Sequence, residues 1–219
     1  MLTYDHALTY FYIMLIALAV GVLFWIKHLY DRFVPGEYLR LFCMLTFVML
    51  FFGSIALGFF MTRFDGFALC SLGGAIGVYF SYYTFAKYLP NYKDDFWETV
   101  VLSCPLMYGI GKIGCATAHC CYGFHYDGIL AVFVKDTSYF PIQKLESIVF
   151  LTLFVVFYIL AKKNKLNCDY AIIAYAVSKF LLDFLRYTHE TSIISFNQVV
   201  CLLIIAFMGY KIKIYSSNS

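Results

Sequence analysis

Residues 41–62 read LFCMLTFVMLFFGSIALGFFMT, a stretch without a single charged side chain. As a helix, an apolar stretch of about 20 residues is long enough to cross the hydrocarbon core of a bilayer. Similar stretches recur along the whole chain, so we predict an all-α, polytopic membrane protein with about seven transmembrane helices. The predicted spans lie near residues 8–26, 41–62, 67–87, 98–116, 145–161, 170–187 and 194–211.

The composition also indicates a membrane protein. Hydrophobic residues make up 63% of the 219 residues and charged residues 13%, whereas about 25% of residues in soluble domains are charged. We therefore expect one transmembrane domain over residues 1–219, with the longest polar connection, at about 117–144, as an outer loop that carries function. The net charge of +3 comes without a basic run interleaved with aromatics, which predicts no nucleic-acid partner.

Lysine and arginine are distributed unequally between alternate connections. One set of connections holds Lys27, Arg32, Arg40, Lys87, Lys93, Lys162, Lys163, Lys165, Lys211 and Lys213. The other set holds Arg63, Lys135, Lys144 and Arg186. Because cytoplasmic loops are enriched in Lys and Arg, we predict that the N-terminus lies outside and the C-terminus in the cytoplasm. The first apolar run follows no Lys or Arg, so we expect it to remain as a helix rather than to be cleaved as a secretory signal.

Two of the predicted spans are weaker than the others. The span at 98–116 contains Pro105 and several glycines, and the span at 170–187 contains Lys179 and Asp183. Bent or polar membrane helices need neighbouring helices to satisfy their polar groups. Since charged groups inside a membrane by default mark a functional site, we expect both spans to contribute to one.

A glycine- and cysteine-rich segment stands at the end of the fourth span, where residues 109–123 read GIGKIGCATAHCCYG. If the helix continues through this segment, Lys112, Cys115 and His119 share one face, because they are spaced by three and four residues. A cation beside a thiol favours the thiolate, and an imidazole can act as its base. The segment therefore predicts an activated cysteine nucleophile.

Three other interpretations of the same segment remain open. Cys115, His119, Cys120 and Cys121 could hold a soft metal ion, although their spacing matches none of the usual zinc patterns. Cys120 and Cys121 could form a redox pair. The glycines and small cysteines could simply allow close helix packing.

The remaining cysteines predict no chemistry. Cys43, Cys70, Cys104 and Cys201 lie in predicted helices, where a buried thiol usually serves as a small apolar side chain. Cys168 lies at the predicted inner surface, where a free thiol is expected.

A charged stripe runs along the sixth span, where Lys179, Asp183 and Arg186 are spaced by four and three residues. Together with Lys112 they predict a cationic pocket for an anionic headgroup. The alternative is an internal ion-pair ladder that fixes helix packing. Glu146, at the start of the fifth span, is expected either at the edge of the same cavity or as a carboxylate that stabilises its own helix dipole.

These segments resemble the bacterial prolipoprotein diacylglyceryl transferase family. Residues 71–77, SLGGAIG, are similar to the family's Gly-Gly-x-x-Gly helix, and residues 111–123 align without a gap with its Gly-Arg-Ile-Gly-Asn signature. Residues 140–146, FPIQKLE, are similar to its His-Pro-Ser-Gln-Leu-Tyr-Glu segment. Residues 179–186, KFLLDFLR, are similar to its Arg-x-x-x-Glu-x-x-Arg helix.

The resemblance implies seven transmembrane helices in a bacterial cytoplasmic (inner) membrane and a transferase without a cofactor. The donor would be a phosphatidylglycerol-like phospholipid, and the acceptor a lipoprotein precursor cysteine or a lipid. The expected substrate-binding residues are Lys112, Gly73, Gly74, Gly114, Gly123, Gln143, Glu146, Tyr175, Lys179, Asp183 and Arg186. The expected catalytic residues are Cys115, His119, Cys120 and Cys121.

The departures from the family pattern suggest altered chemistry on the same scaffold. The signature Arg, Asn and Glu are replaced by Lys112, Cys115 and Cys120, and the Tyr or His before Gly-Gly by Leu72. In one version of the transfer, Cys115 or Cys120 with His119 forms a covalent intermediate. Two further hypotheses are a membrane thiol-redox or metal-binding protein and a non-catalytic lipid-binding paralogue.

Overall fold

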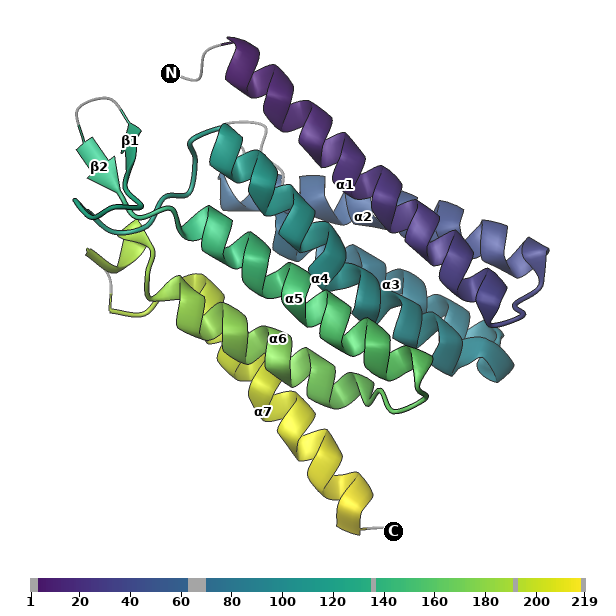
Figure 1. Ribbon diagram of the computed structural model, residues 1–219. Helices are drawn as coiled ribbons and strands as arrows, with labels where there is room; N and C mark the ends of the chain where they lie inside the picture. Colours follow the sequence, from purple (N-terminus) through teal and green to yellow (C-terminus); the bar gives the residue numbers. More distant parts are fainter. Residues whose placement is uncertain (1–3, 63–69, 135–136, 191–192, 218–219) are drawn as a thin grey trace. The chain divides into compact units, whose positions relative to one another are not determined.

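The computed structural model describes residues 4–62, 70–134, 137–190 and 193–217 (Figure 1). Its long helices are α1 Tyr4–Asp31, α2 Gly36–Met61, α3 Ser71–Tyr88, α4 Lys93–Thr117, α5 Ile142–Lys162, α6 Cys168–Asp183 and α7 Phe196–Ser217. The positions of Arg63 and Lys135, and the predicted start of the third span at 67, lie outside the described residues.

The prediction of an all-α, polytopic membrane protein is confirmed. Five described helices, α1, α2, α4, α5 and α7, are long and apolar enough to cross a membrane. Among these five, α4 is the least apolar, as its glycines and charged first turn lead one to expect. Helix α6 was predicted to be weak and, at 16 residues, is too short to count among them, while α3 has 18 residues. The orientation of the termini remains a prediction.

The chain divides into two compact units, and the single transmembrane domain remains a prediction. Residues Ala19–Cys104 form one, here called the α2–α3 unit. Residues Met1–Leu18 and Pro105–Ser219 form the other, here called the site unit. The divisions fall inside α1 and α4, and each unit is described separately.

An aromatic core holds the α2–α3 unit together. Phe42 of α2 stacks on Phe96 of α4 with ring centroids 4.7 Å apart, and it meets Phe85 of α3 edge-on at 5.3 Å. Phe42 and Phe96 are fully buried. Aromatic pairs in such arrangements add about 0.5–1.5 kcal/mol each beyond the burial of their surface, so these rings tie three helices to one another.

Glycines bring α2 and α3 into backbone contact. A Cβ atom added at Gly73 would overlap the backbone oxygen of Gly53, and one added at Gly77 would overlap that of Met49. Small residues permit such close approach between membrane helices. The predicted substrate-binding residues Gly73 and Gly74 are buried here against α2. An apolar groove of about 510 Å³ opens beside the contact.

We expect the substitution Gly77→Ala to destabilise the fold by about 1–3 kcal/mol, because the added methyl group meets backbone, which cannot swing aside as a side chain can. Thermal unfolding in detergent measures the effect. Gly36→Ala is the matched control on α2, since a Cβ there meets nothing within 4 Å. Equal unfolding temperatures for the two variants would contradict the backbone contact.

In the site unit, α6 packs along α7, and a small antiparallel pair of strands lies in the connection between α4 and α5 (Figure 1). Strand β1 Val132–Val134 pairs with β2 Thr137–Tyr139, in the register that places Val132 opposite Tyr139. The polar connection expected at 117–144 contains these two strands, which its sequence does not predict. The strand pair lies along the chain beside the segments that carry the candidate site.

Helix α7 begins with a reciprocal cap that also reaches the site. Ser195 Oγ accepts a hydrogen bond from the Gln198 backbone N–H at 3.2 Å, and Gln198 Oε1 accepts one from the Ser195 N–H at 3.0 Å. This is a capping box, which satisfies two backbone donors that a helix start leaves unpaired. Ser195 Oγ also donates to Asp183 on α6, so the cap fixes a site carboxylate.

Candidate functional site

Helix α4 ends at Thr117, before the histidine and the paired cysteines. The Cys120 N–H donates to the Cys115 carbonyl at 3.2 Å, and the His119 N–H points to the Ala116 carbonyl at 3.4 Å. His119 has a φ of 47°, the left-handed conformation that closes a helix in the Schellman motif. Hydrogen bonds from the loop thus satisfy the last carbonyls of α4.

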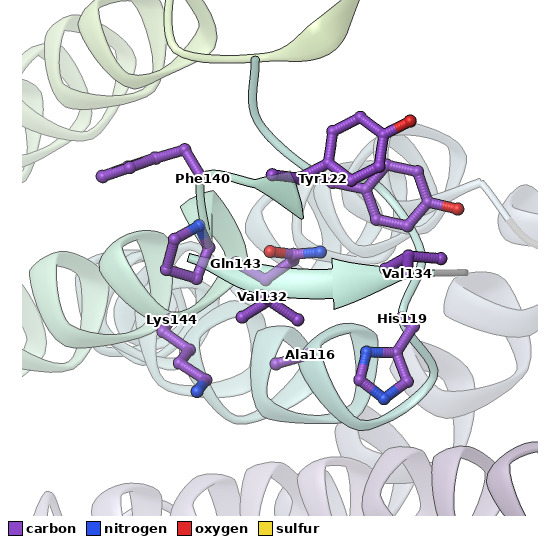
Figure 2. A pocket seen from close by; sticks show the side chains of 10 residues that line it. Ala116, His119, Tyr122, Val132, Val134, Phe140, Gln143 and Lys144 are labelled. Atoms are coloured by element: carbon purple, nitrogen blue, oxygen red, sulfur yellow. The ribbon is translucent and has the colours of Figure 1, made fainter. Parts of the chain in front are cut away.

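The prediction of one shared helix face is therefore wrong for His119. Lys112 and Cys115 are three residues apart on α4 and do share a face. His119 lies beyond the helix and lines a small hollow of about 10 Å³, room for about one water molecule (Figure 2). Gln143 and Lys144 line the same hollow.

The three clustered cysteines do come together. The Sγ atoms of Cys115, Cys120 and Cys121 all lie within 4.8 Å of one another, and all three thiols are free. His119 does not belong to this group. Hydrogen bonds from the Cys115 and Cys120 thiols lower the pKa of Cys121, and hydrogen bonds with Cys115 and Cys121 raise the pKa of Cys120. These three thiols are here called the thiol cluster.

The loop that carries Cys120 and Cys121 is hydrogen-bonded near the start of α5 and the end of α6. Gln143 Nε2 donates to the Cys120 carbonyl at 2.5 Å. The Gly123 N–H donates to the Phe140 carbonyl at 2.9 Å, and Gly123 pairs with Arg186 in an isolated bridge. A Cβ at Gly123 would lie 2.7 Å from the Phe140 oxygen, so glycine is needed at this crossing.

A fully buried carboxylate, Glu146 on α5, collects three cations. Lys112 Nζ lies 2.8 Å from one of its oxygens and Lys179 Nζ 2.5 Å from the other. Arg186 donates from one terminal nitrogen to both oxygens, at 2.8 and 2.9 Å. Tyr108 donates to the carboxylate at 3.2 Å. Helices α4 and α5 and the end of α6 thus meet at one side chain.

Glu146 does not serve its own helix dipole. Helix α5 begins at Ile142, which places Glu146 in the second turn, and the dipole effect falls off within the first turn. Of the two expectations for this residue, placement with the cationic residues is the one that agrees with the observed contacts.

A second buried carboxylate, Asp183, pairs with two of the same cations, Lys179 and Arg186. Its Oδ1 lies 3.1 Å from Arg186 Nε and 3.5 Å from Lys179 Nζ. Its Oδ2 accepts from Ser195 Oγ and lies 3.8 Å from His189 Nε2. Arg186 therefore lies between two carboxylates from different helices, Glu146 and Asp183, which together orient its guanidinium group.

The cations keep some exposure, whereas the carboxylates keep almost none. The side chains of Lys112, Lys179 and Arg186 are 10%, 17% and 13% exposed, compared with 0% for Glu146 and 1% for Asp183. Three cations face two carboxylates, so this group, here called the cation cluster, has a net positive charge. A group with this net charge attracts anions.

Tyr108 and Ser195 belong to the site and were not predicted from the sequence. Both lysine ammonium groups lie over the Tyr108 ring, at 5.1 Å for Lys112 and 5.6 Å for Lys179. The signal for Tyr108 was its position one helical turn before Lys112. The signal for Ser195 was the Ser-x-x-Gln pattern at the start of the last apolar run.

Two other residues that were expected to bind substrate, Gly114 and Tyr175, lie in the site unit and make packing contacts. Gly114 faces α1, since a Cβ there would lie 3.3 Å from the Ile13 side chain. Tyr175 packs its ring against Phe150 and Phe157, at 6.4 and 5.5 Å between centroids. Gly73 and Gly74 belong to the α2–α3 unit. A substrate-binding role for these four residues remains a prediction.

The fold and the site together define a multi-pass membrane protein whose polar residues gather where α4 and α6 end and α5 begins. The family model for prolipoprotein diacylglyceryl transferase matches residues 10–213. The chain therefore belongs to the prolipoprotein diacylglyceryl transferase family, whose members are membrane transferases of lipoprotein biosynthesis. No curated protein matches the chain.

Proposed function

We propose that the protein transfers a diacylglyceryl group from phosphatidylglycerol, or a similar phospholipid, to the cysteine thiol of a lipoprotein precursor in a bacterial cytoplasmic membrane. The observation that carries this proposal is the cation cluster, in which three cations converge on one buried carboxylate and remain partly exposed. A phosphodiester headgroup is an anion that such a cluster would bind through charge-assisted hydrogen bonds.

The reaction requires stabilisation of charge on the leaving phosphate. The acceptor thiolate attacks the glycerol carbon, a C–S bond forms, and the C–O bond to the phosphate breaks with its electron pair staying on the phosphate oxygen. Lys112, Lys179 and Arg186 would stabilise that growing negative charge from fixed positions. Hydrogen-bond donors that are already oriented toward the developing charge lower the activation barrier most in this role.

Other residues of the site would position these cations rather than touch the substrate. Glu146 and Asp183 fix Arg186 from two sides. Gln143 and Gly123 hold the cysteine-bearing loop against α5 and the end of α6. The proposed acceptor thiol would approach from the side of this loop, where Cys121 is exposed.

The proposal predicts that headgroup release depends on the acceptor. Purified protein in phosphatidylglycerol vesicles should release glycerol phosphate when a lipobox peptide with cysteine is added, and should release none with the same peptide carrying serine. Detection of glycerol phosphate in the supernatant measures the reaction. Retention of phosphatidylglycerol without release under either condition would favour a non-catalytic lipid-binding protein instead.

A covalent route through the cysteines is a second candidate, supported by the three sulfur atoms gathered beside the cysteine-bearing loop. In this route, the thiolate of Cys115 or Cys120 attacks the glycerol carbon and glycerol phosphate leaves with the electron pair of the broken C–O bond. The acceptor thiolate then attacks the same carbon, and the enzyme cysteine leaves as a thiolate. Intact-protein mass spectrometry after incubation with phosphatidylglycerol alone tests it. A diacylglyceryl adduct that disappears in Cys120→Ala would support the route, and full turnover by Cys120→Ala would argue against an intermediate at that residue.

A further inference from the structure

The thiol cluster has the composition of a soft-metal site. Cys115, Cys120 and Cys121 place three sulfur atoms within 4.8 Å of one another. Ligated sulfurs at a zinc–sulfur distance of about 2.3 Å are separated by roughly 4 Å, so small side-chain rotations would bring the three thiols to a common ion. Thiolates are ligands that zinc and Cu(I) both accept.

The backbone around the cluster is held in place before any ligand binds. Cys121 has a φ of 57° and His119 a φ of 47°, both in the left-handed region that non-glycine residues rarely occupy. The Cys120 N–H and carbonyl are both hydrogen-bonded, to Cys115 and Gln143. Backbone conformations of this kind are common at functional sites. Here they bring the thiols of Cys120 and Cys121 close to Cys115 near the end of α4.

The electrostatic surroundings suit a metal thiolate. Lys112 lies one turn before Cys115 on the same face, and its charge would offset the excess negative charge of three thiolates around a divalent ion. Cys121 is exposed and Cys115 and Cys120 are partly buried, so an ion and a further ligand can reach the cluster.

We propose that Cys115, Cys120 and Cys121 bind a zinc ion whose fourth position takes the acceptor thiol. This proposal rests on the proposed transfer to a thiol. Catalytic zinc sites keep three protein ligands and one open position, whereas structural sites fill all four. Because a thiol that coordinates zinc loses its proton outright, the cluster would supply the acceptor in its reactive thiolate form.

The acceptor thiol binds the fourth position and its proton passes to solvent. Its sulfur then forms a bond to the glycerol carbon as the C–O bond to the phosphate breaks, and glycerol phosphate leaves with the electron pair. The product is a thioether, a weaker ligand than a thiolate, so the lipidated acceptor can dissociate and the three cysteines remain as ligands.

Metal binding is measured first, without reference to activity. The full chain, purified in detergent under reducing conditions and stripped of metal, should take up one zinc ion per chain when zinc is added, as measured by elemental analysis after gel filtration. Cys121→Ser should bind zinc at least about 100-fold more weakly, since loss of a direct ligand exceeds the roughly 10–100-fold effect of losing an outer-shell partner. Cys168→Ser, a control thiol outside the cluster, should bind as the wild type does.

The fourth position is tested with cobalt, which reports its ligands by absorption. We expect the Co²⁺-loaded protein to show thiolate charge-transfer bands that grow when the cysteine lipobox peptide is added and do not change with the serine peptide. Unchanged bands with both peptides would overturn the role in acceptor activation. Preferential loading by Cu(I) with zinc excluded would overturn the choice of metal.

The outcomes separate this proposal from the proposed function. Acceptor-dependent headgroup release by protein that binds no zinc would overturn the metal site and leave the transferase standing. Zinc binding that is lost in Cys121→Ser and gains a ligand from the cysteine peptide would support the metal site, even if the donor proved to be a different phospholipid. Wild-type zinc affinity in Cys121→Ser, with the fold intact by circular dichroism, would also overturn it.

Discussion

Arg186→Met is expected to reduce turnover by about 10²–10³-fold, the usual loss when one preorganised donor to a developing anion is removed. Arg186 contacts both buried carboxylates through two different nitrogens, with its terminal nitrogen at Glu146 and its Nε at Asp183. Its direction is therefore fixed before the substrate arrives. The measurement is acceptor-dependent release of glycerol phosphate from phosphatidylglycerol.

Two further variants make the Arg186 result interpretable. Arg186→Lys keeps the charge but loses the planar, forked donor geometry, so we expect an activity between those of Arg186→Met and the wild type. Arg40→Met removes an exposed arginine that donates to the Gly36 carbonyl, one turn away at 3.2 Å, and should leave turnover unchanged. Wild-type turnover by Arg186→Met would contradict a role in binding the headgroup.

Glu146→Gln is expected to destabilise the protein by about 3–5 kcal/mol, the typical effect of removing one partner from a buried ion pair. The glutamine would leave Lys112, Lys179 and Arg186 close together, without the carboxylate on which all three converge. Repulsion among the cations would open the contact between α5 and α6. Thermal unfolding and proteolysis in detergent measure the loss.

The matched control is Asp169→Asn, the same chemical change at a partly exposed ion pair. Asp169 lies 2.7 Å from Lys211, whose side chain is 35% exposed. Such surface pairs contribute about 0–1 kcal/mol, so this variant should unfold near the wild-type temperature. If Glu146→Gln were as stable as Asp169→Asn, the buried carboxylate would not hold the cluster together.

The number and type of the long helices could be predicted from the sequence because bilayer thickness sets their length. Uninterrupted apolar stretches such as 41–62 need no tertiary information to be recognised. The pairing of Val132–Val134 with Thr137–Tyr139 was missed, since each strand is only three residues long. Short elements of this kind carry too little local pattern to be distinguished from loop.

The site was predicted in part, for a similar reason. Lys179, Asp183 and Arg186 could be grouped because helical spacing alone places them on one stripe. The central position of Glu146 could not be derived, because it depends on how α4, α5 and the end of α6 pack. His119 was placed wrongly on the helix face because its left-handed backbone conformation ends α4. The neighbouring residue types do not predict a helix end at this position.

The most direct test of the proposed transfer is the mass of a lipobox peptide after incubation with the wild-type protein and phosphatidylglycerol vesicles. The account predicts that the cysteine peptide gains the mass of one diacylglyceryl group and that the serine peptide gains none. An unchanged cysteine peptide, from protein that is folded and retains phosphatidylglycerol, would contradict it.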